Sequence, residues 1–462
     1  MRVEWRMQIW VCTLAVGGLP LLTSAQARPL PGPDVQQIYQ RLLPQIEKIP
    51  MFDHHAHPGF ADDPDVDAMA SPPGSAALRT RDTNPELVAA AKALFGYPYT
   101  DLSPEHAKWL VQKKADLKQT QGKAYFSNIL DKLNIEQGVA NRAMMADYLD
   151  PKHFPWVFFA DSFMWPFDNQ RERSRNRDQE VYIPLQEKML RRWLQQENMR
   201  LPPDFPGYLA FVTRTLEDNQ KKGAIAMKFE VAYFRSTKFG DPMREQAEDV
   251  YLRFVNGGIP NEQEYRIFQD YIFRFLVREG GRLHLPVHIH SAVGIGDYFN
   301  LSEGNIMNLE NMLRDPRYAG TVFVMIHGGY PYEHQAIWLA AMQNVYLDTS
   351  LMELDMYPSQ FKRVLKEFLE TFPDKITFGT DAFPYNQVLG AEESYWLGVQ
   401  SARTALAAAL AEMISEHEVD EAQALQLAHG YLHDNAVGIY HGKVTDMRCA
   451  DPIKGRSSTK LK

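Results

Sequence analysis

Eight short runs rich in apolar and β-branched residues recur along the chain, and their number constrains the fold more than any other feature. The runs cover residues 49–55, 134–144, 156–163, 223–230, 283–290, 321–327, 344–350 and 375–381. Helix-like stretches separate the later runs, at residues 262–278, 305–314, 332–341 and 359–372. Strands that alternate with helices indicate βαβ units and a parallel sheet. Eight such units favour a (β/α)8 barrel of the TIM type, with an open doubly wound sheet as the main alternative.

Two connections between the runs are long enough to carry structure of their own. Residues 58–133 follow the first run, and their helical patterns predict a helical subdomain over the barrel mouth. Residues 164–222 follow the third run and are interpreted as a lid or a solvated helix. Residues 394–441 predict terminal helices that pack outside the barrel. We therefore expect one barrel domain over residues 28–445 with two insertions, followed by a tail at 446–462. No glycine-rich dinucleotide fingerprint follows any run, which weakens the open-sheet alternative.

The first 27 residues are typical of a secretory signal peptide. Arg2 and Arg6 precede an uncharged run at 9–25, and an A-x-A cleavage signal ends at Ala27. The run contains Pro20 and is shorter than the roughly 20 apolar residues that a spanning helix needs. We expect cleavage near Ala27, export to the periplasm or secretion, and no stable insertion in a membrane.

The composition limits the chemistry that the chain can carry. Fourteen histidines stand against two cysteines, so any metal site is built from imidazole and carboxylate groups. This count excludes a zinc finger, an iron–sulfur protein and a scaffold held by disulfides. The net charge of −9 offers no basic surface for nucleic acid. The expected partner is a small-molecule substrate, and a homo-oligomer is left open.

The first run ends in the sequence Asp-His-His-Ala-His at 53–57. Side chains two residues apart on a strand point the same way. We therefore expect Asp53, His55 and His57 to share a face, while His54 faces the surrounding layer. Two imidazoles that project together can bind one metal ion, although such a pair also occurs by chance in many proteins.

Three later runs end in the same kinds of residue. The fifth supplies His288 and His290, the sixth ends at His327 and the eighth ends at Asp381. A barrel places its active site at the carboxyl ends of its strands, so these side chains are expected to meet. For any single histidine a buried structural role remains the simpler interpretation, but four strand ends in this order favour a site.

These residues belong to motifs that are similar to those of the amidohydrolase superfamily. More narrowly, the chain resembles the metal-dependent-hydrolase branch found in nodulin-like and glutamine-synthetase-associated amidohydrolases. The matching segments are DHHAH (53–57), MKFEVAYFRS (227–236), HIHSAVGIGD (288–297), VMIHGGYPY (324–332), NVYLDTS (344–350), FGTDAFPY (378–385) and DNAVGIY (434–440). The HGGYPY and FGTDA segments are the specific ones, and the others support them by order and spacing.

The resemblance implies a metal site and roles for its residues. His55, His57, His290 and Asp381 match the metal ligands of the superfamily, and Asp381 also matches its proton acceptor. His327 matches a histidine that binds a second metal in some subgroups and polarises the substrate in others. Lys228 lies where relatives with two metals carry a carboxylated bridging lysine, and in relatives with one metal a lysine there holds a substrate carboxylate or an ion pair.

Four further residues are weaker candidates. Asp53 and His288 are expected to support the ligands from behind, with a buried ion pair as the alternative for Asp53. Tyr233 and Arg235 follow the fourth run and are candidate substrate contacts, with a solvated loop as the alternative for both.

The resemblance implies an enzyme that activates water with a divalent metal. We expect zinc, with manganese or iron as alternatives, and one ion in preference to two. The preferred reaction is hydrolysis of an amide, lactone or related bond in a small, carboxylated substrate. The alternative is non-oxidative decarboxylation of an aromatic or unsaturated acid. Sugar-acid isomerisation is more distant, and a barrel that binds metal without catalysis is the least favoured.

Overall fold

The computed structural model describes residues 34–66, 77–175, 177–291 and 300–440. The expected signal peptide, the glycine loop with Gly294 and Gly296, and the tail at 446–462 lie outside the described residues. Within the described residues, no helix combines the length and the apolar character needed to cross a bilayer.

Eight parallel strands form one sheet in which each strand pairs with the next along the chain. They are β1 (Met51–Ala56), β2 (Ile135–Asn141), β3 (Trp156–Phe159), β4 (Ala224–Phe229), β5 (Val287–His290), β6 (Phe323–Ile326), β7 (Val345–Asp348) and β8 (Ile376–Thr377). Each predicted run coincides with one of these strands; seven contain their strand whole, and β1 extends one residue beyond its run. The observed strands are shorter than the runs, because residues at the run ends belong to loops or short helices, as at residues 161–163.

Backbone hydrogen bonds between the first strand and the segment after the last one close the ring. The amides of His54 and His57 donate to the carbonyls of Phe378 and Ala382 at 2.9 and 2.8 Å. The amide of Asp381 donates to the carbonyl of His55 at 2.7 Å. Because β8 itself spans only two residues, residues 378–382 continue its edge and complete the barrel. The prediction of a (β/α)8 barrel is confirmed.

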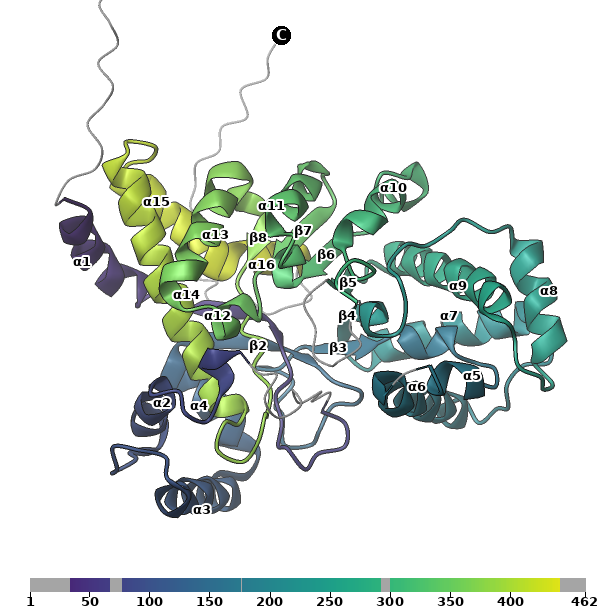
Figure 1. The fold of residues 1–462 in the computed structure, drawn as a ribbon, viewed down its shortest axis with the longest axis horizontal. Coiled ribbons are helices and arrows are strands. Elements are labelled where there is room, and N and C mark those ends of the chain that lie inside the picture. The colour runs from purple at the N-terminus through teal and green to yellow at the C-terminus, as the bar shows by residue number, and fades with distance from the viewer. Residues whose placement is uncertain (1–33, 67–76, 176, 292–299, 441–462) are drawn as a thin grey trace, which may run out of the picture.

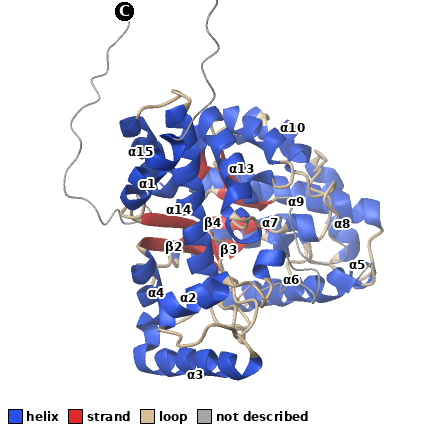
Figure 2. Ribbon diagram, turned by 60° about the vertical axis from the view of Figure 1, so that its left-hand side comes forward, coloured by secondary structure: helices blue, strands red, loops and turns tan. Residues whose placement is uncertain are grey.

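Helices surround the strands on all sides (Figure 2), as the alternation of runs predicted. Their bounds are α1 (Asp34–Ile46), α2 (Glu86–Phe95), α3 (Pro104–Gln121), α4 (Tyr125–Leu133), α5 (Gln170–Arg173), α6 (Arg177–Gln196), α7 (Phe205–Lys221), α8 (Arg244–Phe254), α9 (Glu262–Leu283), α10 (Glu310–Leu313), α11 (Glu333–Ala336), α12 (Met352–Asp355), α13 (Pro358–Thr371), α14 (Ala391–Ser415), α15 (Glu421–His429) and α16 (Asn435–Tyr440).

Both predicted insertions are helical, and they lie at different ends of the molecule (Figure 1). The first contains α2, α3 and α4 and hangs below the strands, whereas the second contains α5, α6 and α7 and lies beside α8 and α9. Lys114 on α3 donates to the carbonyl of Val388 at 3.2 Å. This contact joins the first insertion to the segment after β8, where the barrel opens.

The barrel interior is filled in two layers. The lower layer is apolar and brings together Phe52 of β1, Val139 of β2, Val324 of β6 and Tyr440 of α16. Residues from opposite strands meet here, so α16 closes the bottom of the barrel. The upper layer, at the carboxyl ends of the strands, consists of histidines and acidic residues. This division places the polar chemistry at one end of a packed core.

Candidate metal centre

Three residues just beyond strands β6, β7 and β8 have a left-handed backbone although none is glycine. His327, Leu351 and Asp381 have φ angles of 66°, 67° and 54°. Such conformations cost about 1–3 kcal/mol each and gather at functional sites. Two of the three are predicted site residues, and the third begins the turn that leads into α12. These three turns lie at the same end of the barrel as the predicted site residues.

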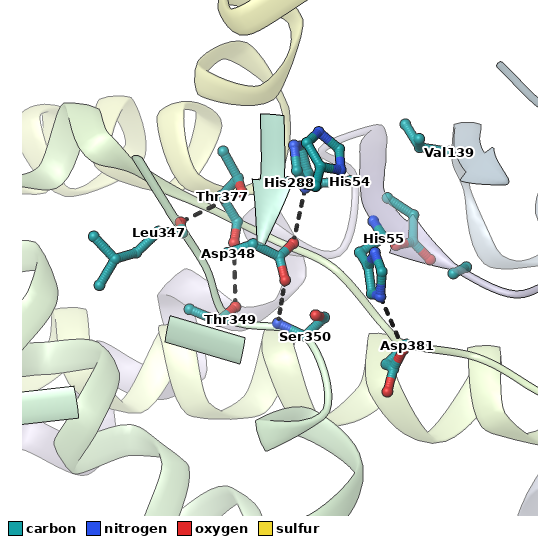
Figure 3. Close-up of polar contacts among 12 residues, drawn as sticks. His54, His55, Val139, His288, Leu347, Asp348, Thr349, Ser350, Thr377 and Asp381 are labelled. Atoms are coloured by element: carbon teal, nitrogen blue, oxygen red, sulfur yellow. Dashed lines mark hydrogen bonds and ion pairs between the residues drawn. The ribbon is translucent and has the colours of Figure 1, made fainter. Parts of the chain in front are cut away.

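His55, His57 and Asp381 lie together at the barrel mouth and are all buried. The Nε2 atom of His55 is 3.2 Å from Oδ1 of Asp381, and Nε2 of His57 is 3.4 Å from the same oxygen. The two Nε2 atoms are 3.3 Å apart. Figure 3 shows the His55 ring directed at Asp381. The expectation that His55 and His57 share a face therefore agrees with the structure.

His327 joins this group from β6. Donor atoms of His55, His327 and Asp381 all lie within 4.8 Å of one another, close enough to hold one ion. Nε2 of His327 is 3.2 Å from Nδ1 of His290, and the His290 ring packs on Tyr233 at a centroid distance of 4.5 Å. His57 contacts His55 and Asp381, and His290 contacts His327, so the four expected ligands and His327 form one cluster. Which of them bind metal stays a prediction.

The residues present fit a divalent cation. Imidazole nitrogen and carboxylate oxygen are common zinc ligands, and the ligand form of histidine is the neutral ring. Burial lowers the pKa of His55 well below its usual value, and the positive charge of Lys228 lowers it further. Burial also lowers the pKa of His327. Both rings are therefore neutral near pH 7, with a lone pair for a metal.

Lys228 approaches the same cluster from β4. Its Nζ is 3.2 Å from Nε2 of His55 and 3.4 Å from Oε1 of Glu230, and the side chain is buried. The ammonium group of Lys228 can thus donate a hydrogen bond to the Nε2 lone pair of His55. The Glu230 contact agrees with the ion pair weighed for this lysine, while its carboxylation stays a prediction.

Asp53 does not point at the cluster but ties β1 to the segment after β8. Its carboxylate accepts hydrogen bonds from the amide and hydroxyl of Thr380 and from the amide of His55. Burial raises the pKa of Asp53 to about 8. Among the described residues no basic side chain pairs with it, so the alternative of a buried ion pair is not observed. Asp53 supports the backbone that carries His55 and Asp381.

The prediction that His54 faces the surrounding layer is wrong. Its ring lies inside the barrel, with Nδ1 3.1 Å from Oδ2 of Asp348 and Nε2 2.9 Å from the Tyr440 hydroxyl. The register between β1 and β2 shifts between Asp53 and Ala56, so that three steps on β1 match two on β2. An extra residue of this kind breaks the alternation of side chains along a strand.

His288 and Arg235 have partners away from the cluster. Nε2 of His288 is 3.1 Å from the Tyr440 hydroxyl, so His288 supports the layer beneath the ligands. Arg235 is buried and pairs with Asp270 on α9 at 2.7 Å. Tyr233 and Arg235 also line a cavity of about 300 Å³. Arg235 therefore does not lie in a solvated loop. Contact between Arg235 and a substrate stays a prediction.

Two acidic residues near the site were not singled out from the sequence. Asp348 ends β7 and accepts hydrogen bonds beneath the cluster. The expectation that polar residues at the carboxyl ends of the strands form the site applies to the seventh run as well, and it would have identified Asp348. Asp355 ends α12, and its pKa is raised to about 7 by burial and by the charge of Asp381, against the effect of Arg79. No local sequence pattern marks Asp355, because its burial and its approach to Asp381 arise only in the folded chain.

A parallel eight-stranded barrel with histidines and an aspartate at its strand ends is an arrangement that could hold a metal ion. The chain belongs to the amidohydrolase family, whose model matches residues 209–441. This match includes the segments from β4 to α16 and leaves β1 outside. The assignment of His55 and His57 to the site therefore rests on the geometry.

Similar solved structures agree with this fold, and one protein matches part of the chain in sequence. A stretch of 159 residues is 28% identical to protein fluG of Emericella nidulans, covering 34% of this chain and 17% of fluG. Glucuronate isomerase from Caulobacter crescentus superposes with a TM-score of 0.61 at 13% identity, covering 92% of this chain and 97% of that one. A metal-dependent hydrolase from Lactobacillus casei gives 0.56 at 16% identity, covering 87% and 97%. At these identities the two structures show the shared fold alone.

Proposed function

We propose that the protein is a metal-dependent hydrolase that adds water to an amide, lactone or related bond of a small, carboxylated substrate. The observation that carries this proposal is the buried group of His55, His327 and Asp381, whose donor atoms lie within 4.8 Å of one another. The amidohydrolase family supports it, because the group lies at the end of the barrel where such enzymes place their sites.

His55, His57, His290 and Asp381 are the residues that would hold the ion, and His327 is near enough to join them. One zinc ion is favoured, with manganese or iron as alternatives. A divalent ion bound here lowers the pKa of water and polarises the scissile carbonyl.

The protein's own residues supply the proton transfers and the orientation. Asp381 accepts a proton from the attacking water and returns it to the leaving group. His327 would hold the attacking water in line, because its Nδ1 proton is directed at the Ser350 carbonyl and its Nε2 lone pair can accept a hydrogen bond from that water. Lys228 attracts the substrate carboxylate, since its ammonium lies at the floor of the same cluster. Substrate selection is assigned to the first insertion, because α3 borders a cavity of about 420 Å³ with the segments that follow β1 and β8.

The test begins with the metal content of the protein as purified from its source. One transition metal per chain supports the single-ion form, whereas two assign Lys228 and His327 to a second ion. The chelated protein is then reloaded with zinc or manganese and offered N-acyl amino acids, lactones, carboxylated aromatics and sugar acids in ¹⁸O-labelled water. Incorporation of ¹⁸O by the wild type and its loss in Asp381→Asn are the expected results.

Other outcomes identify the alternatives. Release of carbon dioxide without ¹⁸O incorporation would replace the hydrolase with a decarboxylase. Interconversion of sugar acids without a new carbon–oxygen bond from water would identify an isomerase. Equal turnover by the wild type and Asp381→Asn would remove the assigned role of Asp381.

A further inference from the structure

A buried polar layer lies directly beneath the metal cluster, and Asp348 is at its centre. His54, His288 and Asp348 are completely buried, and Tyr440 is almost so. Figure 3 shows the rings of His54 and His288 beside each other, next to the Asp348 carboxylate. Asp348 comes from β7, His54 from β1, His288 from β5 and Tyr440 from α16, so this layer joins opposite sides of the barrel.

One oxygen of Asp348 begins a hydrogen-bond chain towards the barrel floor. Oδ2 lies 3.1 Å from Nδ1 of His54, and Nε2 of the same ring lies 2.9 Å from the Tyr440 hydroxyl. A carboxylate only accepts, so Nδ1 of His54 carries the proton and Nε2 accepts from Tyr440. The Tyr440 oxygen then accepts from Nε2 of His288 at 3.1 Å. Each donor thus points towards Asp348, and the Asp348 carboxylate is the final acceptor of these hydrogen bonds.

The other oxygen of Asp348 holds the turn that supports His327. Oδ1 accepts a hydrogen bond from the Ser350 amide at 3.0 Å. The Ser350 carbonyl and hydroxyl lie 3.0 and 3.1 Å from Nδ1 of His327. A carbonyl only accepts, so Nδ1 of His327 carries the proton and the Nε2 lone pair faces the cluster. The position of Ser350 thus decides which nitrogen of His327 is presented.

Gly379 leaves the space that Asp348 occupies. A Cβ atom at Gly379 would lie 2.4 Å from Oδ2 of Asp348 and 2.9 Å from Cβ of Ser350. The glycine stands two residues before Asp381 in the FGTDA segment. The FGTDA segment therefore provides Asp381 to the cluster, and its glycine leaves the space for the Asp348 carboxylate, which supports His327.

We propose that Asp348 is a positioning residue that fixes the ring orientation and the tautomer of His327 through the Ser350 turn. The role concerns the same centre as the proposed function. The positioning role is tested by the metal affinity and by the tautomer of His327, neither of which depends on the reaction. If the protein is not a hydrolase, these two measurements still test the role of Asp348.

The test compares two substitutions at Asp348 with a matched control. Asp348→Ala removes the acceptor for the Ser350 amide, whereas Asp348→Asn keeps one acceptor oxygen in the same place. Glu353→Gln is the control, because Glu353 is a buried carboxylate of the same segment that bonds to Thr349 and Tyr431 instead. Gly379→Ala displaces Asp348 without changing it, and it provides a second perturbation if Asp348→Ala does not fold.

Zinc affinity by chelator competition and the visible spectrum of the cobalt-substituted protein are the first readouts. Loss of a group that orients a ligand typically lowers metal affinity 10–100-fold. We expect this loss and a changed cobalt spectrum in Asp348→Ala and Gly379→Ala, and a change within about threefold in Asp348→Asn and Glu353→Gln. The second readout is the ¹⁵N spectrum of His327 in metal-free protein, in which the protonated Nδ1 is expected to persist only in the wild type, Asp348→Asn and the control.

Three results would overturn the proposal. Wild-type zinc affinity and tautomer in Asp348→Ala would show that Ser350 needs no support from Asp348. An equal loss in Asp348→Ala and Asp348→Asn would assign the effect to charge and not to the turn. An equal loss in Glu353→Gln would assign it to general disturbance of the segment.

Discussion

Asp355 has a carboxylate whose ionised form destabilises the folded protein, and replacing it with asparagine is expected to increase stability. Burial and the like charge of Asp381 raise its pKa from 3.8 to about 7, although Arg79 opposes them. No hydrogen bond or ion pair of the side chain with another described residue offsets this cost. Asparagine has nearly the same shape without the charge, so little packing is lost.

The sign of the pH dependence follows from proton binding. Between the two pKa values the folded protein holds a proton on Asp355 that the unfolded chain has released, so the wild type loses stability as the pH rises through this range. Below pH 3.8 the penalty disappears, and above pH 7 it is complete. The full shift corresponds to about 4 kcal/mol, of which about 3 kcal/mol develops between pH 4.5 and pH 8.

The assay is urea unfolding of metal-free wild type and Asp355→Asn at both pH values. We expect the gain in the free energy of unfolding to be about 3 kcal/mol larger at pH 8 than at pH 4.5. The control is Glu245→Gln on the exposed face of α8, for which a change within about 0.5 kcal/mol is expected at either pH. Bound zinc should reduce the gain, because a cation beside Asp381 offsets its negative charge. A gain that is independent of pH, or a loss at pH 8, would refute this reasoning.

Three further predictions follow from the cluster and from the contacts of one buried arginine. His55→Asn and Asp381→Asn should each lower zinc affinity at least 100-fold in calorimetry, and wild-type affinity in both would contradict the assignment of the centre. Removing the metal with a chelator should lower the unfolding free energy by about 2.7 kcal/mol relative to protein with free zinc at 100 times its dissociation constant, and an unchanged melting curve would exclude a bound ion. Arg79 is completely buried and bonds to a carboxylate and two carbonyls, so Arg79→Met should cost about 3–5 kcal/mol in urea unfolding. Arg41→Met, at an exposed ion pair, should cost less than about 1 kcal/mol. Equal losses of unfolding free energy in Arg79→Met and Arg41→Met would contradict the larger stabilisation assigned to Arg79.

The barrel was predictable because its eight strands are apolar runs separated by helices, a pattern that depends on local sequence. Helical character in the first insertion was predictable for the same reason, whereas for the second the sequence left a lid or a solvated helix open. The strand ends His55, His57, His327 and Asp381 followed from the rule that barrels place polar residues at that edge. These features need no knowledge of which distant side chains touch.

The errors and omissions have a different origin. The orientation of His54 depends on a register shift between β1 and β2, which the spacing of residues within β1 does not reveal. The ion pair of Arg235 with Asp270 was not foreseen, because Asp270 lies on a helix elsewhere in the chain. Asp355 acquires its raised pKa only from burial near Asp381. Each depends on pairing between distant segments, which a single sequence leaves open.

The bonds that close the barrel join parts of the chain that are made first and last. Asp53 and Thr380, which join the segments that carry His55 and Asp381, are 327 positions apart. During synthesis His55 and His57 therefore emerge long before Asp381, and the complete metal site cannot exist until the last strand has docked. At the proposed centre, metal binding would then act as a check on the finished barrel, because a chain truncated or misfolded near β8 keeps its histidines but lacks Asp381. Metal retention should thus report whether the two ends of the ring have met.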